Sequence, residues 1–434
     1  MEDRSQLNRF LNSMAEEGRV EETSLPLTVS LQQAFKKLGA FQLPFQEAWV
    51  LKVVQAAVAA GAERLQIAQS SEATSFYFIG ITEWDSRQIG EAVTSLDGNM
   101  GPGLHHLATA LRALARGTEL AFSLQFPSGP SLVWTGQEFL QTEFEGEPAE
   151  EFILSVSHFG RDGRLWRLLA STVSHRIGSV LRQGAYLAPI PVQLVSSLIN
   201  NAVGDPVFGN GYNSQVLAVL PHGAGALHVE LDEWQSYNSR EEQFSLTGEQ
   251  WVVSPQTLQC SSLGFVVGSF GRGKSRINSI KSMVSQILWV QDGVVIEREA
   301  LALESDIGIG VLVDATGLGT DLGGFALRQS EEKKSARKKA LEGVGDELQS
   351  RLEAGEANLK VTCSYSVDKW MALGAVGAGL LDPALAACGL LAVGFGHGIG
   401  RLVLNNSSKK LRDELRQNLP RIAKRLSSED RSDW

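Results

Sequence analysis

The alternation of apolar and polar positions divides the chain into helices and short strands. An Ala- and Val-rich run at 45–62 predicts a long helix that ends at Gly61, a residue typical of helix C-termini. Alternating runs predict strands on either side of a second helix at 104–114. These strands are expected at 64–68, 75–80, 121–126 and 131–135. Strands before and after helices favour an α+β layer over a regular β–α–β series.

A second block of elements follows between residues 152 and 327. A helix is predicted at 164–181, and an extended run that contains two prolines is predicted at 187–194. An antiparallel hairpin is predicted at 287–297, because an Asp-Gly pair between two apolar runs is typical of a hairpin turn. The pattern at 329–360 is helical and highly charged, which predicts a solvated face.

The length of 434 residues exceeds what one hydrophobic core usually serves, so several domains are expected. Shifts in composition predict an N-terminal arm, a helix-on-sheet domain, an α/β domain, a charged helical linker, and an apolar helical hairpin with a basic tail. The expected ranges are, in that order, 1–30, 31–156, 157–330, 331–360 and 361–434.

Composition and charge exclude several classes of protein. The formal net charge of −10 argues against a nucleic-acid-binding protein, which normally carries a basic face. The first 22 residues are polar and lack the apolar core of a secretory signal, so a cytoplasmic protein is expected. The three cysteines lie far apart and are expected to be reduced, and the histidines, His105 and His106 among them, have no metal-binding spacing and are expected at the surface.

Three glycines precede the helix at 104–114. Gly98, Gly101 and Gly103 stand in the segment Gly-Asn-Met-Gly-Pro-Gly. Glycines allow backbone N–H groups to approach phosphate oxygens, and a helix N-terminus favours an anion. The segment is therefore a candidate phosphate-binding loop, with a simple turn as the alternative.

The order of these elements resembles the ATP-binding domain of the GHKL superfamily, in the branch of the heat-shock protein ninety chaperones. In that family a helix carries Glu-x-x-x-Asn, a strand end carries Asp-x-Gly, and a glycine box opens a later helix at the phosphates. The resemblance implies a helix-on-sheet sandwich followed by a middle-type α/β domain, over about residues 31–330. Segments similar to the glycine box, the closing strands, the start of the middle domain and two later parts of it are 98–103, 132–156, 186–194, 288–299 and 320–325.

The resemblance also implies a pocket that binds ATP but has lost hydrolysis. Lys52 stands where the family has its catalytic Glu, and a charged lysine cannot accept the proton of the attacking water. Ala56 stands at the position of the magnesium-binding Asn and offers no oxygen ligand, so Mg²⁺ is not expected. The Asp-x-Gly box is missing from 78–85, where either Glu83 or Asp85 would have to face the adenine. No catalytic residue is therefore assigned.

A second phosphate-binding pattern occurs at 268–275, which matches the P-loop Gly-x-x-x-x-Gly-Lys-Ser. Its candidate binding residues are Gly268, Gly273, Lys274 and Ser275. An apolar strand is predicted before it at 263–267, and apolar residues spaced over 277–287 predict an amphipathic helix after it. The hairpin that follows does not suit the parallel sheet of a P-loop NTPase, which favours the alternative of an exposed glycine loop.

The C-terminal region is apolar and rich in glycine. Runs at 370–381 and 384–404 are separated by Asp-Pro, and the first is shorter than the roughly 20 residues of a membrane span. Their small residues predict two closely packed helices, placed in the core, shallowly in a bilayer, or at a contact between copies. The basic tail at 409–426 has apolar residues at helical spacing, which suits an anionic membrane surface, a partner groove, or the protein's own acidic surface.

These patterns favour a chaperone-like pseudoenzyme, a binding or regulatory protein whose C-terminal hairpin serves membrane association or assembly. The expected ligand is ATP, and the expected partners are another protein, a second copy, or an anionic membrane surface at the inner face of a membrane. One alternative is an active ATP hydrolase that uses the GHKL-like pocket or the P-loop. Another is a membrane-acting effector in which the hairpin is the active part.

Overall fold

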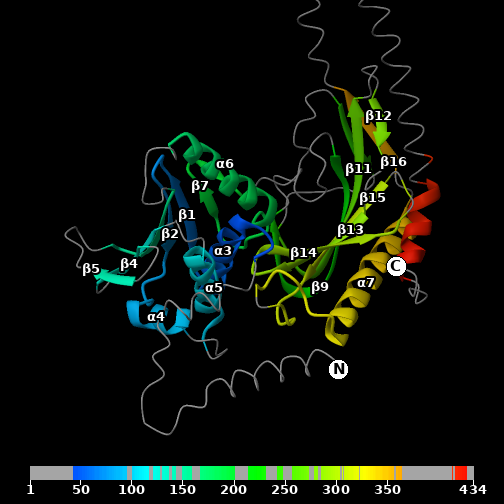
Figure 1. Cartoon of the computed structure of the whole chain (residues 1–434). Helices are drawn as coiled ribbons and strands as arrows, with labels where there is room; N and C mark the ends of the chain where they lie inside the picture. Colours follow the sequence, from blue (N-terminus) through cyan, green and yellow to red (C-terminus); the bar gives the residue numbers. More distant parts are fainter. Residues whose placement is uncertain are drawn as a thin grey trace, which may run out of the picture.

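The protein is an α+β chain with two mixed β-sheets and helices packed on both (Figure 1). The computed structural model describes residues 43–94, 100–116, 121–127, 130–135, 139–142, 149–158, 167–200, 214–230, 242–247, 257–272, 278–281, 285–303, 305, 307–321, 323–355, 358–363, 413 and 416–427. We call the described residues of 43–200 the N-terminal unit and those of 214–427 the C-terminal unit. The expected α+β class is confirmed.

The sheet of the N-terminal unit has the strand order β5-β4-β3-β6-β2-β1-β7-β8 in the described part of the chain. All neighbours are antiparallel except β1 and β7, which pair in parallel. Burial alternates along the strands, so one face carries the apolar side chains that meet the helices. The strands are β1 Arg64–Gln69, β2 Ala73–Ile79, β3 Phe122–Gln125, β4 Ser131–Trp134, β5 Phe139–Thr142, β6 Phe152–Ser157, β7 Val192–Leu194 and β8 Ser197–Leu198.

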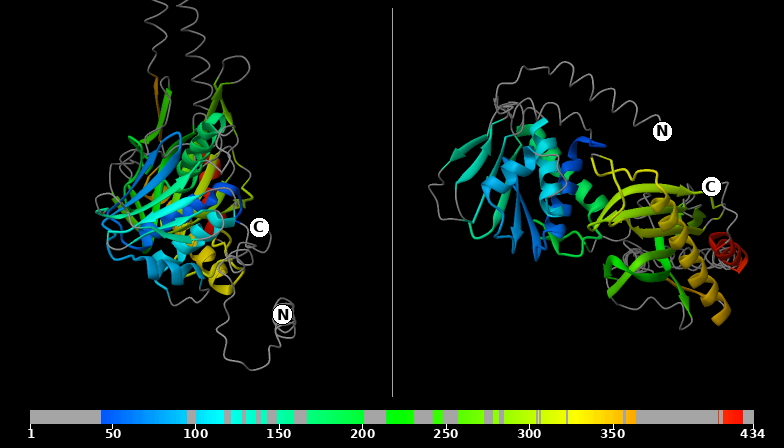
Figure 2. Two further views of the ribbon diagram at one scale, coloured as in Figure 1. Left: turned by 60° about the vertical axis from the view of Figure 1, so that its left-hand side comes forward. Right: turned by 90° about the horizontal axis from the view of Figure 1, so that it is seen from below.

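Helices cover one face of this sheet and separate it from the C-terminal unit (Figure 2). Helix α3, preceded by the 3-10 turn η1, is buried over its first nine residues, because its Ala and Val side chains let neighbouring elements approach closely. The predicted helices at 45–62, 104–114 and 164–181 are confirmed as α3, α5 and α6. The helices are η1 Gln46–Ala48, α3 Trp49–Ala59, α4 Ser86–Thr94, α5 Pro102–Arg116 and α6 Arg167–Gly184.

The sheet of the C-terminal unit follows the order β12-β11-β15-β13-β14, with β9 also paired to β11. Strands β13 and β15 are parallel, and the predicted hairpin is confirmed as β13 and β14. Its turn residues Asp292 and Gly293 have φ of 48° and 72°, as such a turn requires. The strands are β9 Ser214–Glu230, β11 Thr257–Arg272, β12 Asn278–Lys281, β13 Ser285–Gln291, β14 Val294–Leu301 and β15 Ile307–Asp314, and β10 Glu242–Thr247 pairs separately with β16 Asn358–Cys363.

The helix and the solvated face predicted for the charged segment at 329–360 are confirmed in α7 Glu331–Ala354, but its other face is packed. Ser330 caps it by accepting the N–H of Lys333 at 3.2 Å. One face, which includes Leu341, Val344 and Leu348, is fully buried against the C-terminal sheet. High charge therefore did not exclude burial, because the apolar residues lie on one side of the helix.

The basic tail forms a helix at 416–427 that packs on α7. Leu419, Ile422 and Leu426 are buried, and Gly345 of α7 leaves room for Leu426, since a Cβ there would lie 2.9 Å from Leu426 Cβ. The apolar face of this helix is thus covered by the protein itself. The arm at 1–30 and the apolar runs at 370–404 lie outside the described residues, within which no helix is long and apolar enough to cross a membrane.

The boundary expected at 156 does not match the sheet. After β6, helix α6 and a connector at 185–191 bring the chain back to β1, where β7 and β8 extend the same sheet. The connector is fixed at Asn200, whose Nδ2 donates to the carbonyl oxygens of Ala188 and Ile190. The N-terminal unit therefore continues to Asn200.

Candidate functional site

Polar side chains gather where helices α3 and α5 meet the C-terminal unit. Lys52 and Gln55 come from α3 and His106 comes from α5. Asp292 in the β13–β14 turn and Asp321 in the loop after β15 face them from the other side. We call these five residues the junction cluster.

Lys52 links the two units directly. Its side chain is 1% exposed, and its Nζ donates to Gln55 Oε1 at 2.6 Å and to the carbonyl oxygen of Gly324 at 2.9 Å. Lys52 Nζ also lies 4.4 Å from the centroid of the Phe325 ring, within the range of a cation–π contact when the amino group is protonated. One buried amino group is therefore bonded to its own helix and to the loop of the other unit.

Gln55 makes the second link between the units. It lies three residues after Lys52 and therefore on the same face of α3, toward the C-terminal unit. Its Nε2 donates to the carbonyl oxygen of Gln291 at 3.0 Å. Gln291 Oε1 is buried and has no hydrogen-bond partner within the described part of the chain. A side chain of α3 thus binds the backbone at the start of the hairpin turn.

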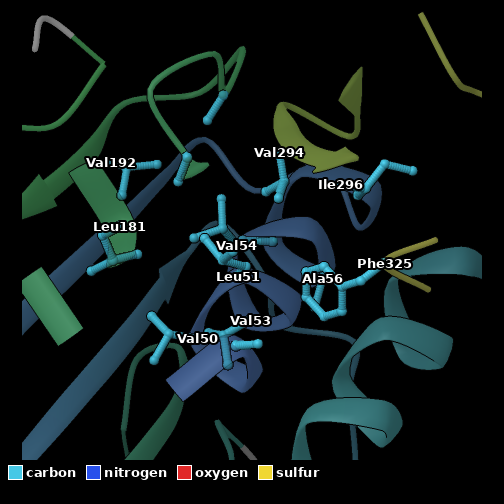
Figure 3. Close-up of a cluster of buried hydrophobic side chains, with 14 of the residues drawn as sticks. Val50, Leu51, Val53, Val54, Ala56, Leu181, Val192, Val294, Ile296 and Phe325 are labelled. Atoms are coloured by element: carbon cyan, nitrogen blue, oxygen red, sulfur yellow. The ribbon is translucent and has the colours of Figure 1, made fainter. Parts of the chain in front are cut away.

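The cluster is set in an apolar contact between the units. Leu51, Val54 and Ala56 of α3 lie beside Val294 and Ile296 of β14 (Figure 3). Phe325 from the loop joins the same group, and its residue is only 8% exposed. This apolar surround removes water from Lys52 and His106, so a charge on either is costly unless it is paired.

Two glycines allow the C-terminal unit to approach this closely. Gly324 has φ of 68° and a Cβ at this position would meet Lys52 Nζ. Gly293 has φ of 72°, and a Cβ there would meet the backbone of Ala188. Both positions therefore combine a left-handed backbone with a contact that leaves no room for a side chain.

Burial changes the ionisation of the two basic groups. Loss of water lowers the pKa of Lys52 to about 7, against the opposing effect of the Asp321 and Asp292 carboxylates. His106 Nε2 lies 3.0 Å from Asp292 Oδ2. Burial lowers the pKa of His106 although the bond to Asp292 acts in the opposite direction, and the nearby Lys52 charge lowers it further. A neutral His106 would donate its Nε2 proton to the carboxylate.

His106 was expected at the surface, but it is 6% exposed. The spacing of Gly103, His106 and Ala110 places them on one side of α5. Gly103 touches α3, where its Cβ would lie 2.9 Å from Ala60 Cβ. The run of small residues around His106 was the signal in the sequence that this side of the helix is packed.

The glycines of the predicted phosphate-binding loop have different surroundings in the structure. Gly98 lies outside the described residues. Gly101 is exposed and a Cβ there would meet nothing within 4 Å, whereas Gly103 is buried in the contact between α3 and α5. Of the two acidic residues proposed to face adenine, Glu83 is exposed and Asp85 accepts the N–H of Gln88 at 2.7 Å at the start of α4.

Of the structural context predicted for the P-loop, the strand at 263–267 is confirmed within β11, but the helix over 277–287 is wrong. Gly268 belongs to β11, which continues to Arg272 and pairs in antiparallel with β12. The amphipathic helix expected over 277–287 does not form, because β12 and β13 occupy described parts of that range. The strand–loop–helix order that positions phosphate in a P-loop is therefore not met. Gly273, Lys274 and Ser275 lie outside the described residues.

Comparison with known proteins adds little. No protein-family model and no curated protein sequence matches the chain. A crystal structure of the N-terminal domain of a DNA repair protein is similar, with a TM-score of 0.36 and 10% sequence identity, over 74% of this chain and 99% of that chain. A likeness at this level assigns neither a fold nor a function. In the described part of the chain no group of three or more His, Cys, Asp or Glu residues could hold a metal ion.

Proposed function

We propose that the protein is a non-hydrolysing, GHKL-like binding or regulatory protein, related to chaperones. One observation carries the proposal. At the position where the resemblance calls for a catalytic Glu, Lys52 is buried and bonded at 2.9 Å to the carbonyl oxygen of Gly324 in the other unit. This position joins two units instead of activating water.

The chemistry of the position supports this role. A general base must accept a proton from water within hydrogen-bond reach, whereas the Lys52 amino group donates to two oxygen atoms already. Its side chain is 1% exposed, so solvent water has no access to it. Ala56, at the position of the magnesium ligand, is fully buried and has no oxygen to offer.

Two further parts of the proposal concern ligands and partners. The segment that contains Gly101 is the proposed ATP-binding element, since Gly101 is exposed and a Cβ there would meet nothing within 4 Å. The region after β16, with the basic surface of the helix at 416–427, is the proposed element for membrane association or assembly. Arg421 and Lys424 are exposed on that helix.

The first test is the release of phosphate from ATP in the presence of Mg²⁺ by the purified full-length protein. We expect turnover at the level of the buffer, and the same for Lys52→Met and Lys274→Ala. Turnover that Lys52→Met abolishes would contradict the non-hydrolysing role. Turnover that only Lys274→Ala abolishes would favour a hydrolase that uses the segment 268–275.

A further inference from the structure

The junction cluster sets two buried basic side chains against two carboxylates that lie nearer the surface. Lys52 and His106 are 1% and 6% exposed, and they face Asp292 and Asp321 of the other unit. We infer that this contact is a proton-sensitive latch, which opens by taking up protons and closes as it releases them. The inference rests on the role in joining the units that we proposed for Lys52.

The closed contact depends on bonds that cross from one unit to the other. Lys52 Nζ bonds to the Gly324 carbonyl at 2.9 Å, Gln55 Nε2 bonds to the Gln291 carbonyl at 3.0 Å, and His106 bonds to Asp292 at 3.0 Å. Separation of α3 and α5 from the C-terminal unit would break all three. It would also return both basic side chains to water.

Every packed element contributes to the electrostatics of the latch. Lys52 is the single ionisable residue of α3. Helix α5 adds His106, with His105 and Arg112 nearby, all of which carry or can gain positive charge. The hairpin turn contributes Asp292 and the loop after β15 contributes Asp321, whose negative charges favour the protonated form of Lys52. The C-terminal unit therefore faces Lys52 with the negative charges of Asp292 and Asp321.

Lys52 sets the direction of the response. In the closed contact its pKa is about 7, and in the open state it returns toward its ordinary value of 10.5. Between these values the open state holds a proton that the closed state lacks, so a lower pH favours opening. Within this window the equilibrium constant for opening increases by about tenfold for each unit by which the pH falls. Below pH 7 Lys52 is charged in both states and adds no further dependence.

His106 acts in the same direction at lower pH. Burial lowers its pKa below the ordinary value of 6.5, so the closed contact holds it neutral where the open state would protonate it. His105 is exposed on α5 and is not assigned to the latch. Acid therefore opens the latch and alkali closes it, with Lys52 acting above pH 7 and His106 below.

The experiment is hydrogen exchange by mass spectrometry between pH 7 and 9.5, on peptides that cover 288–296 and 318–328. The intrinsic rate at each pH is divided by the measured rate, which gives the protection factor. For the wild-type protein we expect the protection factor to increase by up to about tenfold for each unit by which the pH is raised. For Lys52→Met we expect no such increase. A wild-type protein without the rise, or a Lys52→Met variant that keeps it, would overturn the latch.

Lys333→Met is the matched control. Lys333 is 4% exposed and lies in the first turn of α7, where it pairs with Glu297 at 2.6 Å and not with a member of the junction cluster. Its replacement removes a buried lysine of the same size and should leave the pH dependence at the junction intact. Loss of the dependence in this variant as well would show that it reflects general destabilisation, and the latch would be rejected.

Asp321→Asn keeps the inference testable where Lys52→Met fails to fold. Asn retains an Oδ1 that can accept the N–H groups of Phe325 and Ala326. It removes a charge that raises the pKa of Lys52, so the rise in protection should begin at lower pH, and for this comparison the exchange series of both proteins is extended below pH 7. An unchanged onset would contradict the latch. ATP turnover in the same samples would overturn the proposed function alone, whereas flat protection would overturn the latch alone.

Discussion

Two neighbouring glycines show how differently single residues contribute to the proposed ligand loop. Gly103 lies against Ala60 at the contact of α5 with α3, and a methyl group at this position would force the helices apart. Gly101 precedes the same helix but has open space around its Cα. Gly103 is therefore needed for packing, while Gly101 is available for a ligand.

Gly101→Val tests the ligand role without disturbing the fold. A β-branched side chain would keep phosphate oxygens from the backbone N–H groups, so we expect ATP affinity to fall by at least about tenfold in calorimetric titration. The thermal midpoint should stay unchanged. Gly90→Ala in α4, where a Cβ also meets nothing within 4 Å, is the control and should bind as the wild type does. Equal affinity in Gly101→Val would show that the segment is only a turn.

At the scale of elements, the basic helix at 416–427 is divided into two sides. Its apolar side, with Ile422 4% exposed, packs on α7, and its basic side with Arg421 is exposed. An amphipathic helix that inserts in a membrane uses its apolar side for lipid. Here that side is already covered, so contact with an anionic surface would rest on charge.

Ile422→Asp should separate this helix from α7. A carboxylate in this apolar contact has no partner there, and we expect a loss of roughly 3 kcal/mol in the free energy of unfolding. Urea denaturation measures it as a lower midpoint. The neighbouring Arg421→Asp changes an exposed position and should cost no more than about 0.5 kcal/mol. Equal midpoints for the two variants would mean that the helix is not docked in solution.

At the scale of the whole molecule, the apolar runs at 370–404 are flanked by two segments of the C-terminal unit. Strand β16 pairs with β10 before them, and the helix at 416–427 packs on α7 after them. Ending the chain near residue 358 would remove both of these segments along with the apolar runs. Deletion of 370–404 alone is therefore the sharper way to test their role.

The full-length protein should co-sediment with vesicles of anionic lipid, and the variant without 370–404 should stay in the supernatant. Apolar burial stabilises binding by about 25 cal/mol per Å², and basic side chains add about 1 kcal/mol each near the charged surface. Arg421→Glu with Lys424→Glu should therefore weaken binding more at low salt than at high salt. Neutral vesicles serve as the control. A full-length protein that remains in the supernatant would contradict membrane association.

The sequence predicted those elements whose signals are local. The Ala/Val run identified α3, and Asp-Gly identified the turn between β13 and β14, where both residues have positive φ. The apolar spacing over 277–287 misled, because it fits a helix while antiparallel pairing with β11 makes a strand of Asn278–Lys281. The spacing of apolar residues along the chain does not show which distant strand a segment will pair with.

For the same reason the sequence predicted only part of the junction cluster. Lys52 was singled out by its unusual position in the resemblance, but the Gly324 carbonyl that binds it lies 272 residues away in the chain. His106 could not be matched with Asp292 before the fold was known. Side chains that meet across two units are far apart in the chain, so no motif of fixed spacing identifies them in the sequence.

The parallel pairing of β1 with β7 has a consequence for synthesis of the chain. Leu65 pairs with Val192, so a ribosome releases β1 long before the strand that completes its edge. Until Val192–Leu194 emerges, the nascent chain exposes on β1 a row of unpaired backbone N–H and C=O groups, a template for pairing with another chain. Polysomes carry many such intermediates close together, and aggregation between them competes with folding. Slow translation before the connector at 185–191 would lengthen that exposure, whereas a chaperone that occupies this edge would shorten it.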